Sequence, residues 1–450
     1  MMELWNGAHR GVWHTTQRLP ASWERRLSSR RLLKGDETSP LPAGRCVRLV
    51  ASNLMPHILS AVLSATMLAS LTARAGIERL WLGHAGADPS RITICWETSA
   101  AADSTVEFGV TAALGQTARS AEPVTLHQVE IPTPRLDGPW HYRVRSGGEA
   151  SGTIAVRGWE TNVFRAVVVA DLGYAVTNWA AAVLRERPHL LLSAGDNVPQ
   201  LHRGDQPATA GDYSAYRHLI DRAPELFRTT PFMPALGNHD RELRPRGPKP
   251  PPVPVYDVEA TAFRTFFALP GDRWKWTFDV PAFGVRFMAL DLEHTSDFGT
   301  TWQTGHDFGT NSEQLVWFRR TMAASRQPFV LTLHNERNAT VRGLAQGAWW
   351  PVLAQGSAVV SGFGYFAERA LVDGVPCLNT AVNGRGARYP DPKSAFFASE
   401  DNYVLLTCAP GRPSRLELKS LAGAVLDATA LAPRNPDWPK ARPFTPAKNY

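Results

Sequence analysis

The spacing of apolar and polar positions changes near residue 160 of this 450-residue chain. From Gly76 to Trp159, short segments alternate apolar and polar residues, and turn residues separate them. Alternation with period two at this spacing is typical of antiparallel strands packed as a β-sandwich. We therefore predict an all-β sandwich over residues 76–159, with Trp96 pointing inward and with no catalytic spacing of its own. The expected strands cover residues 91–96, 104–108, 125–131 and 140–144.

Beyond residue 160, apolar runs typical of buried strands alternate with segments of helical periodicity. Such alternation favours an α/β domain, which we place at residues 160–431. Residues 432–450 are rich in proline and polar residues and are predicted to form a tail. The expected strands cover residues 167–170, 190–192, 231–236, 329–333, 403–407 and 415–418, and the expected helices cover residues 176–186, 213–227 and 312–322.

Residues 1–75 read as a basic leader that ends in a signal-peptide-like segment. Residues 1–54 carry nine basic and four acidic side chains, residues 49–73 are uncharged, and Ala73-Arg74-Ala75 has the small-x-small pattern of a cleavage site. This order predicts export to the periplasm or the medium, and a start at Met55 would give a compact signal. The alternative is a retained membrane anchor, although Asn53, Pro56 and His57 interrupt the apolar run.

The leader also accounts for most of the formal net charge of +7. Residues 1–54 and Arg74 together supply six of these charges, so the chain from residue 76 onward carries only +1. A nearly neutral chain gives no reason to expect nucleic acid as a partner. Four cysteines in a chain of this length exclude a disulfide scaffold, and the absence of a Cys-x-x-Cys pair excludes a zinc ribbon and a thioredoxin motif. Motifs of ATPases, serine hydrolases and zincins are also missing from the sequence.

Polar residues suited to bind metal follow several of the predicted strands. Asp171 follows the strand at 167–170, Asp196 follows the strand at 190–192, and the pair Asn238-His239 follows the strand at 231–236. His334 ends the strand at 329–333. In open α/β sheets, sites are built at the edge where the strands end. Carboxylates, a carboxamide and an imidazole suit zinc, iron or manganese, and a pair of such ions can clamp a phosphoryl group.

This ordered set resembles the motifs of the calcineurin-like metallophosphoesterases, and specifically their purple acid phosphatase branch. The resemblance covers about residues 76–431. It implies a four-layer α/β (α+β) sandwich of two sheets flanked by helices, preceded by an immunoglobulin- or fibronectin-III-like β-sandwich. It further implies an activity like that of acid phosphatases, the metal-dependent hydrolysis of a phosphoester. In this reaction a metal-bound hydroxide attacks phosphorus. The implied metal ligands are Asp171, the bridging Asp196, Asn238 and His334, and His239 matches the residue that protonates the leaving group or steadies the transition state.

The last motif of that family, Gly-His-x-His, is altered in this chain. Phe363 and Tyr365 replace its two histidines, and Pro199 stands where purple acid phosphatases carry an iron-binding tyrosine. Phenylalanine cannot bind a metal, whereas Tyr365 could bind trivalent iron as a phenolate. Tyr174 and His294 are further groups that could compensate. The alternative to a hydrolase is therefore a non-catalytic relative that binds a ligand or protein in the same cleft.

The segment Arg241 to Tyr256 follows His239 directly and contains six prolines. Such a segment cannot enter a sheet interior, so we expect an extended surface loop beside the site. Arg241, Arg244 or Arg246 would then bind an anionic substrate, and the alternative is a solvated insertion.

Overall fold

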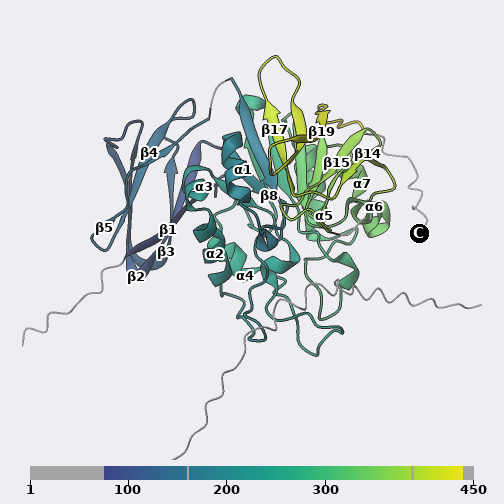
Figure 1. Cartoon of the computed structure of the whole chain (residues 1–450), viewed down its shortest axis with the longest axis horizontal. Helices are drawn as coiled ribbons and strands as arrows, with labels where there is room; N and C mark the ends of the chain where they lie inside the picture. Colours follow the sequence, from purple (N-terminus) through teal and green to yellow (C-terminus); the bar gives the residue numbers. More distant parts are fainter. Residues whose placement is uncertain (1–75, 160–161, 387–389, 439–450) are drawn as a thin grey trace, which may run out of the picture. The chain divides into compact units, whose positions relative to one another are not determined.

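The computed structural model describes residues 76–159, 162–386 and 390–438 (Figure 1). The predicted leader and signal segment (residues 1–75) and the end of the predicted tail (439–450) lie outside the described residues. Among the residues that the structure describes, no helix is both long and apolar enough to span a bilayer. The predicted domain boundaries near residues 160 and 431 remain predictions.

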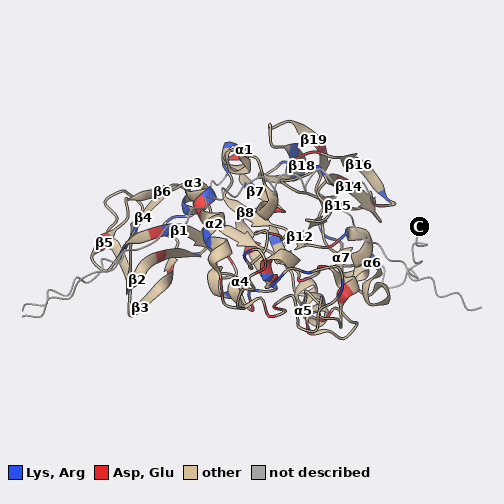
Figure 2. Ribbon diagram, turned by 60° about the horizontal axis from the view of Figure 1, so that its bottom comes forward, with Lys and Arg blue, Asp and Glu red and all other residues tan. Residues whose placement is uncertain are grey.

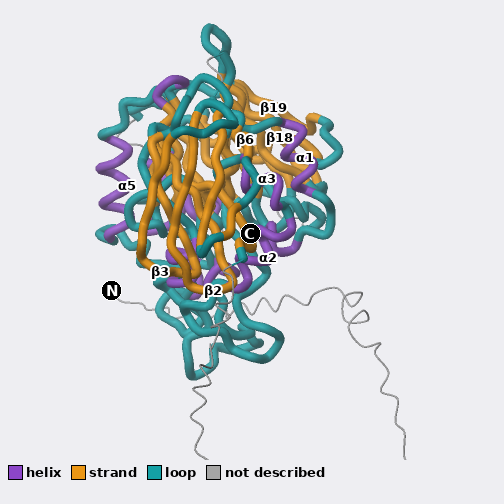
Figure 3. Tube along the Cα trace, turned by 90° about the vertical axis from the view of Figure 1, so that its left-hand side faces the viewer, coloured by secondary structure: helices purple, strands orange, loops and turns teal. Residues whose placement is uncertain are grey.

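The N-terminal part is all-β, as the alternating pattern predicts. The segments at 91–96 and 104–108 belong to one long strand, β2, whose register against β3 shifts between Glu97 and Ser104. Figure 3 shows β2 and β3 running alongside each other. Trp96 points inward as expected: it is fully buried and stacks on His127. The strands of this sheet are β1 (Ile77–Gly83), β2 (Arg91–Gly109), β3 (Gln116–Pro132), β4 (Trp140–Ser146), β5 (Glu149–Ala150) and β6 (Ile154–Val156).

Two further sheets follow in the chain, and both contain parallel and antiparallel strands. The first has the order β19-β18-β17-β7-β8-β9 and the second has the order β10-β11-β12-β13-β15-β14-β16. The strands are β7 (Phe164–Val169), β8 (Leu190–Ser193), β9 (Phe232–Pro234), β10 (Trp276–Val280), β11 (Val285–Ala289), β12 (Phe329–His334), β13 (Ala358–Ser361), β14 (Ala367–Val372), β15 (Val375–Asn379), β16 (Ser394–Ala398), β17 (Asn402–Cys408), β18 (Arg415–Ser420) and β19 (Val425–Ala430).

Helices cover these sheets, and their ends follow local chemistry. Ser312 accepts a hydrogen bond from the Leu315 amide and caps α5, which satisfies a free N–H of the first turn. The single helix expected at 213–227 is instead two helices, because Ala223 leaves helical geometry and Pro224 starts a new first turn. The helices are α1 (Trp179–Glu186), α2 (Ser214–Arg222), α3 (Pro224–Thr229), α4 (Thr261–Phe266), α5 (Glu313–Ala323), α6 (Asn338–Gly347) and α7 (Trp350–Leu353).

Residues of β12 and β13 show how the second sheet is covered on both faces. Leu331 and Val360 belong to the core shared with the first sheet, whereas their neighbours Val330 and Val359 belong to the core that holds α5 and α7. Successive side chains of a strand point to opposite faces, so both faces must be apolar. The result is the predicted four-layer arrangement of helices, two sheets and helices (Figure 1). The predicted fold class is confirmed.

Charged side chains of the N-terminal sheet pair with those of α2. Glu97 is buried, and its carboxylate accepts hydrogen bonds from Arg79 at 2.8 Å and from Arg217 at 2.9 Å. Arg79 also pairs with Asp221 at 3.0 Å. Figure 2 shows basic and acidic residues interspersed along this part of the chain. A buried carboxylate needs such partners because burying an unpaired charge is costly.

His84 makes the stability of this fold sensitive to acid. The ring is 1% exposed, its Nδ1 lies 2.7 Å from the Arg91 carbonyl oxygen, and burial lowers its pKa to about 4. In the unfolded chain the pKa is about 6.5, so the unfolded state takes up the proton first as the pH falls. We expect this group to lower the free energy of unfolding between pH 6.5 and pH 4, and no further below that. Denaturant unfolding at several pH values should show a shallower decline for His84→Gln, and equal slopes in the two proteins would contradict this.

Candidate active site

The carboxyl ends of β7 and β8 bring two aspartates together. Asp171 and Asp196 come two and three residues after these strands, and the Asp171 amide donates to the Gly195 carbonyl at 3.2 Å. Both aspartates have left-handed backbone angles, with φ of 58° and 55°. Such angles are uncommon outside glycine and concentrate at functional sites. The local backbone therefore positions two buried carboxyl groups against each other.

Burial and proximity make it unfavourable for both carboxyl groups of this pair to ionise. Asp171 is 1% exposed and Asp196 is 5% exposed. Burial raises the pKa of Asp171 well above its usual range, and the adjacent Asp196 carboxylate raises it further. Burial also raises the pKa of Asp196. Like charges this close do not both ionise readily, so Asp171 holds a proton that a cation could replace.

A tight turn carries Asn238 and His239 against Asp196. It is the 3-10 helix Asn238–Arg241, which follows β9 and Gly237. A side chain at Gly237 would place its Cβ 2.2 Å from Asp196 Oδ1, so only glycine allows this approach. The buried Asp240 accepts bonds from the Gly237 amide and from the Asn197 side chain, both at 2.9 Å. These bonds hold the turn onto the loop that contains Asp196.

His239 lies between two polar partners and remains partly open to solvent. Its side chain is 19% exposed, and its Nδ1 lies 2.8 Å from Glu242 Oε2. The Tyr174 hydroxyl lies 3.0 Å from Nε2 and 3.1 Å from Nδ1, and it donates to the Pro199 carbonyl at 3.1 Å. Burial lowers the pKa of His239, but Asp196 and the bond to Glu242 outweigh burial and raise it above its ordinary value. The ring is therefore oriented and favoured as a proton donor.

His334 ends β12 on the same edge of the molecule and is completely buried. Its Nδ1 accepts from the Glu336 amide at 3.2 Å, while its Nε2 has no hydrogen-bond partner among the described residues. Burial lowers its pKa to about 4, so the ring is neutral at neutral pH. The next residue, Asn335, donates to the carbonyls of Ala194 and Gly362 and so ties β12 to the ends of β8 and β13.

The two positions that depart from the family pattern lie just beyond β13. Asn379 holds the Phe363 backbone from both sides, accepting from its amide at 3.1 Å and donating to its carbonyl at 2.8 Å. Tyr365 has a left-handed φ of 62°, and its ring meets Tyr174 edge-on with centroids 6.0 Å apart. Tyr365 therefore reaches the His239 side of the site through Tyr174.

The structure contradicts a substrate contact by Arg241. Its side chain is fully buried and turns inward, where it pairs with Asp291 at 2.6 Å and with Glu293 at 3.1 Å. Arg246 pairs with Asp297 at 2.7 Å and lies over the Trp302 ring, while Arg244 is partly buried. A proline-rich loop suggests an exposed arginine. Here, however, ion pairing with two interior carboxylates stabilises the buried position of Arg241.

Sequence reasoning missed Glu242 as a partner of His239. Glu242 stands three residues after His239 and is 7% exposed, which is unusual for a carboxylate. An acid three residues after a histidine in a tight turn is the one sequence signal for this contact. Asn335 carried no comparable signal, because its partners Ala194 and Gly362 lie far away in the sequence, as does Asn197, which bonds Asp240. His294, weighed as a compensating ligand, has its Nδ1 3.4 Å from Arg246.

The residues present fit a cation at the carboxylate pair, although the donor set is reduced. Asp171 Oδ2 and His334 Nε2 are buried without hydrogen-bond partners in the described structure, as ion-binding atoms would be. In the same described residues, no group of three or more His, Cys, Asp and Glu side chains is arranged to hold a metal ion. The two aspartates thus make up the carboxylate part of the donor set.

Comparison with known proteins gives a family and a fold. The calcineurin-like phosphoesterase profile matches residues 164–362, from the start of β7 to one residue before Phe363. The structure of a purple acid phosphatase from yellow lupin (Lupinus luteus) seeds matches with a TM-score of 0.61 and 15% identity, covering 80% of this chain and 74% of that one. The structure of PhoD matches with a TM-score of 0.57 and 11% identity, covering 80% and 90%. These two likenesses concern the fold, and no curated protein sequence matches the chain.

Proposed function

Through residues 164–362 this chain belongs to the calcineurin-like phosphoesterases, and we propose that it is an exported, metal-dependent phosphoester hydrolase. The observation that carries the proposal is the buried Asp171–Asp196 pair beside an oriented His239. Export rests on the leader pattern of residues 1–75. The substrate class is a phosphoester, and the metals are iron, zinc or manganese.

Asp171, Asp196, Asn238 and His334 would hold the metal, with Tyr365 as a further oxygen donor. When bound, the metal supplies Lewis-acid activation of the phosphoryl group and of water. His334 contributes a buried, neutral imidazole, and binding of a cation at the carboxylate pair would require Asp171 to release its proton.

His239 would act as the general acid for the leaving alcohol. Glu242 accepts the bond from Nδ1 and so orients the ring, whose Nε2 lies 3.0 Å from the Tyr174 hydroxyl. Burial, followed by the nearby carboxylates of Asp196 and Glu242, raises the pKa of Tyr174 far above its usual range, so its hydroxyl stays protonated. A neutral phenol beside Nε2 steadies the ring without taking its proton. A positioned acid of this kind typically contributes about 10²–10⁴-fold to a rate.

The test is metal content and hydrolysis measured on the same preparation. The chain is produced with iron, zinc and manganese supplied, and bound metal is counted per chain. We expect stoichiometric metal that dialysis against a chelator removes together with phosphomonoester hydrolysis, and less metal in His334→Ala. Native chain that retains no metal and hydrolyses no phosphoester would overturn the proposal. The mass of the recovered protein also shows whether residues 1–75 have been removed.

A non-catalytic binding protein is the second candidate function. It is favoured by the reduced donor set and by the replacement of both histidines of the last motif, at Phe363 and Tyr365. Removing a group that only hydrogen-bonds a metal ligand typically lowers metal affinity by about 10–100-fold. Loss of the ligands themselves should lower metal affinity by more than that. In that case Phe363→His combined with Tyr365→His would create metal binding that the native chain lacks, whereas tight metal in the native chain would contradict it.

A further inference from the structure

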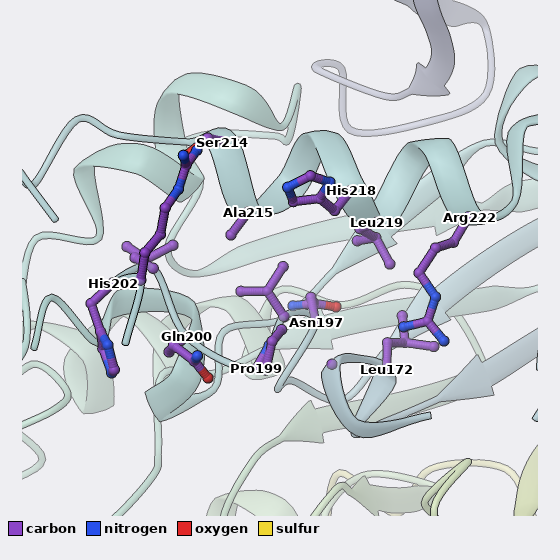
Figure 4. Close-up of a pocket in the computed structure, with 14 residues that line it drawn as sticks. Leu172, Asn197, Pro199, Gln200, His202, Ser214, Ala215, His218, Leu219 and Arg222 are labelled. Atoms are coloured by element: carbon purple, nitrogen blue, oxygen red, sulfur yellow. The ribbon is translucent and has the colours of Figure 1, made fainter. Parts of the chain in front are cut away.

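A cavity of about 460 Å³ lies next to the candidate site, between α2 and the loop that follows β8 (Figure 4). One wall is the stripe of α2 that contains Ser214, His218 and Arg222, and the other is the loop from Asn197 to Arg203. Leu172 and Gly173, immediately after Asp171, also line it. The volume is in the range of small-molecule sites, which are typically about 300–1,000 Å³.

The lining of this cavity is apolar inside and basic around its edge. Leu172, Val198 and Leu219 are buried and supply apolar surface. Four residues supply cationic or titratable groups, and no aspartate or glutamate lines the cavity. Figure 4 shows His202 at one end and Arg222, from α2, at the other. The four residues are His202, Arg203, His218 and Arg222. This combination suits an apolar group that carries an anion.

Glu242 contacts both a residue of the cavity lining and a residue of the candidate site. His202 Nε2 lies 3.5 Å from Glu242 Oε1, and the other oxygen of the same carboxylate lies 2.8 Å from His239 Nδ1. The cavity loop also begins directly after Asp196, and Pro199 in this loop accepts the Tyr174 hydroxyl bond. A ligand group in the cavity would therefore lie against the same short segments that hold the carboxylate pair and His239.

We propose that this cavity binds the alcohol portion of the phosphoester substrate, and that this portion is a ring-sized apolar group carrying its own anionic group. The assignment rests on the proposed hydrolase function for its link to catalysis. The apolar lining accommodates the ring, and Arg203, which is exposed at the rim, pairs with the anion. Arg222 is less available to bind the anion, because one of its nitrogens donates a hydrogen bond to the Ala175 carbonyl at 2.5 Å.

The binding test compares two alcohols that differ by one carboxylate. Fluorescence titration of the full chain with 6-hydroxy-2-naphthoate and with 2-naphthol requires no turnover. We expect the naphthoate to bind about tenfold more tightly, in line with one charge-assisted hydrogen bond at a partly exposed site. Arg203→Ala should abolish the preference and Arg203→Lys should retain most of it. Arg326→Ala removes an exposed arginine that does not line the cavity and should change nothing.

A kinetic comparison then links the cavity to the reaction. The phosphate monoester of 6-hydroxy-2-naphthoate should show a kcat/KM about tenfold above that of 2-naphthyl phosphate, and Arg203→Ala should remove the difference. Equal binding of the two alcohols, or a preference that survives Arg203→Ala, overturns the cavity assignment. A binding preference without a matching preference in kcat/KM overturns its role as a substrate subsite. A chain that prefers the naphthoate but hydrolyses no phosphoester overturns the proposed function and leaves the ligand class of the cavity standing.

Discussion

Replacing His239 by alanine is expected to lower kcat for phosphomonoester hydrolysis by about 10²–10⁴-fold, the usual contribution of a positioned general acid. The reason is geometric. Glu242 holds Nδ1 at 2.8 Å and the His239 side chain is 19% exposed, so an oriented ring remains accessible to deliver a proton. Loss of the ring leaves the Asp171–Asp196 pair intact, because these carboxyls are held by their own loops and by the Gly237 turn.

The dependence on the leaving group separates an acid from a structural residue. A good leaving group such as p-nitrophenolate needs little protonation, whereas phenolate needs more. His239→Ala should therefore impair phenyl phosphate hydrolysis more than p-nitrophenyl phosphate hydrolysis, with metal content unchanged. His141→Ala, on β4 of the N-terminal sheet, serves as the control and should leave both rates unaltered. An equal loss on the two substrates would argue against proton donation by His239.

Replacing Arg241 by methionine is expected to destabilise the fold by about 3–5 kcal/mol, the range observed when one partner of a buried ion pair is removed. The side chains of Arg241, Asp291 and Glu293 are all 0% exposed. Burial raises the pKa of Asp291, but Arg241 and His306 outweigh it and hold the pKa below its usual range, so Asp291 is ionised. Methionine keeps most of the volume of arginine and leaves that charge poorly compensated. Arg241 also donates to the Thr304 and Val258 carbonyls, which would lose their partner.

Equilibrium unfolding in denaturant measures this effect, and a surface ion pair provides the control. Arg264 pairs with Glu259 at 3.3 Å, with side chains 38% and 67% exposed. Arg264→Ala should change the free energy of unfolding by no more than about 1 kcal/mol. If Arg241→Met were as mild as Arg264→Ala, the buried cluster would not be an important source of stability. A substrate-binding role for Arg241 would instead predict altered KM with little change in stability.

The sequence by itself determined the fold class, the positions of nine of the 19 described strands and the edge at which the polar residues gather. Buried parallel strands are continuous apolar runs, and residues that follow them must lie at one edge of the sheet. The positions of Asp171 and Asp196 after two such strands are sufficient to predict that they lie at the same edge. The spacing at which apolar residues recur along the chain is a local property, so it can be recognised without knowledge of the tertiary structure.

Only the tertiary structure decided which side chains meet and which way they point. Arg241 turns inward because Asp291, 50 residues away, accepts its charge. Tyr174 reaches His239 across 65 residues, and His202 joins Glu242 at the edge of a cavity built from α2 and a loop. The long strand β2 and the division between α2 and α3 likewise depend on neighbouring strands and on packing. Contacts between distant loops carry no periodic signal, because they arise from the packing of whole elements and the burial of charge.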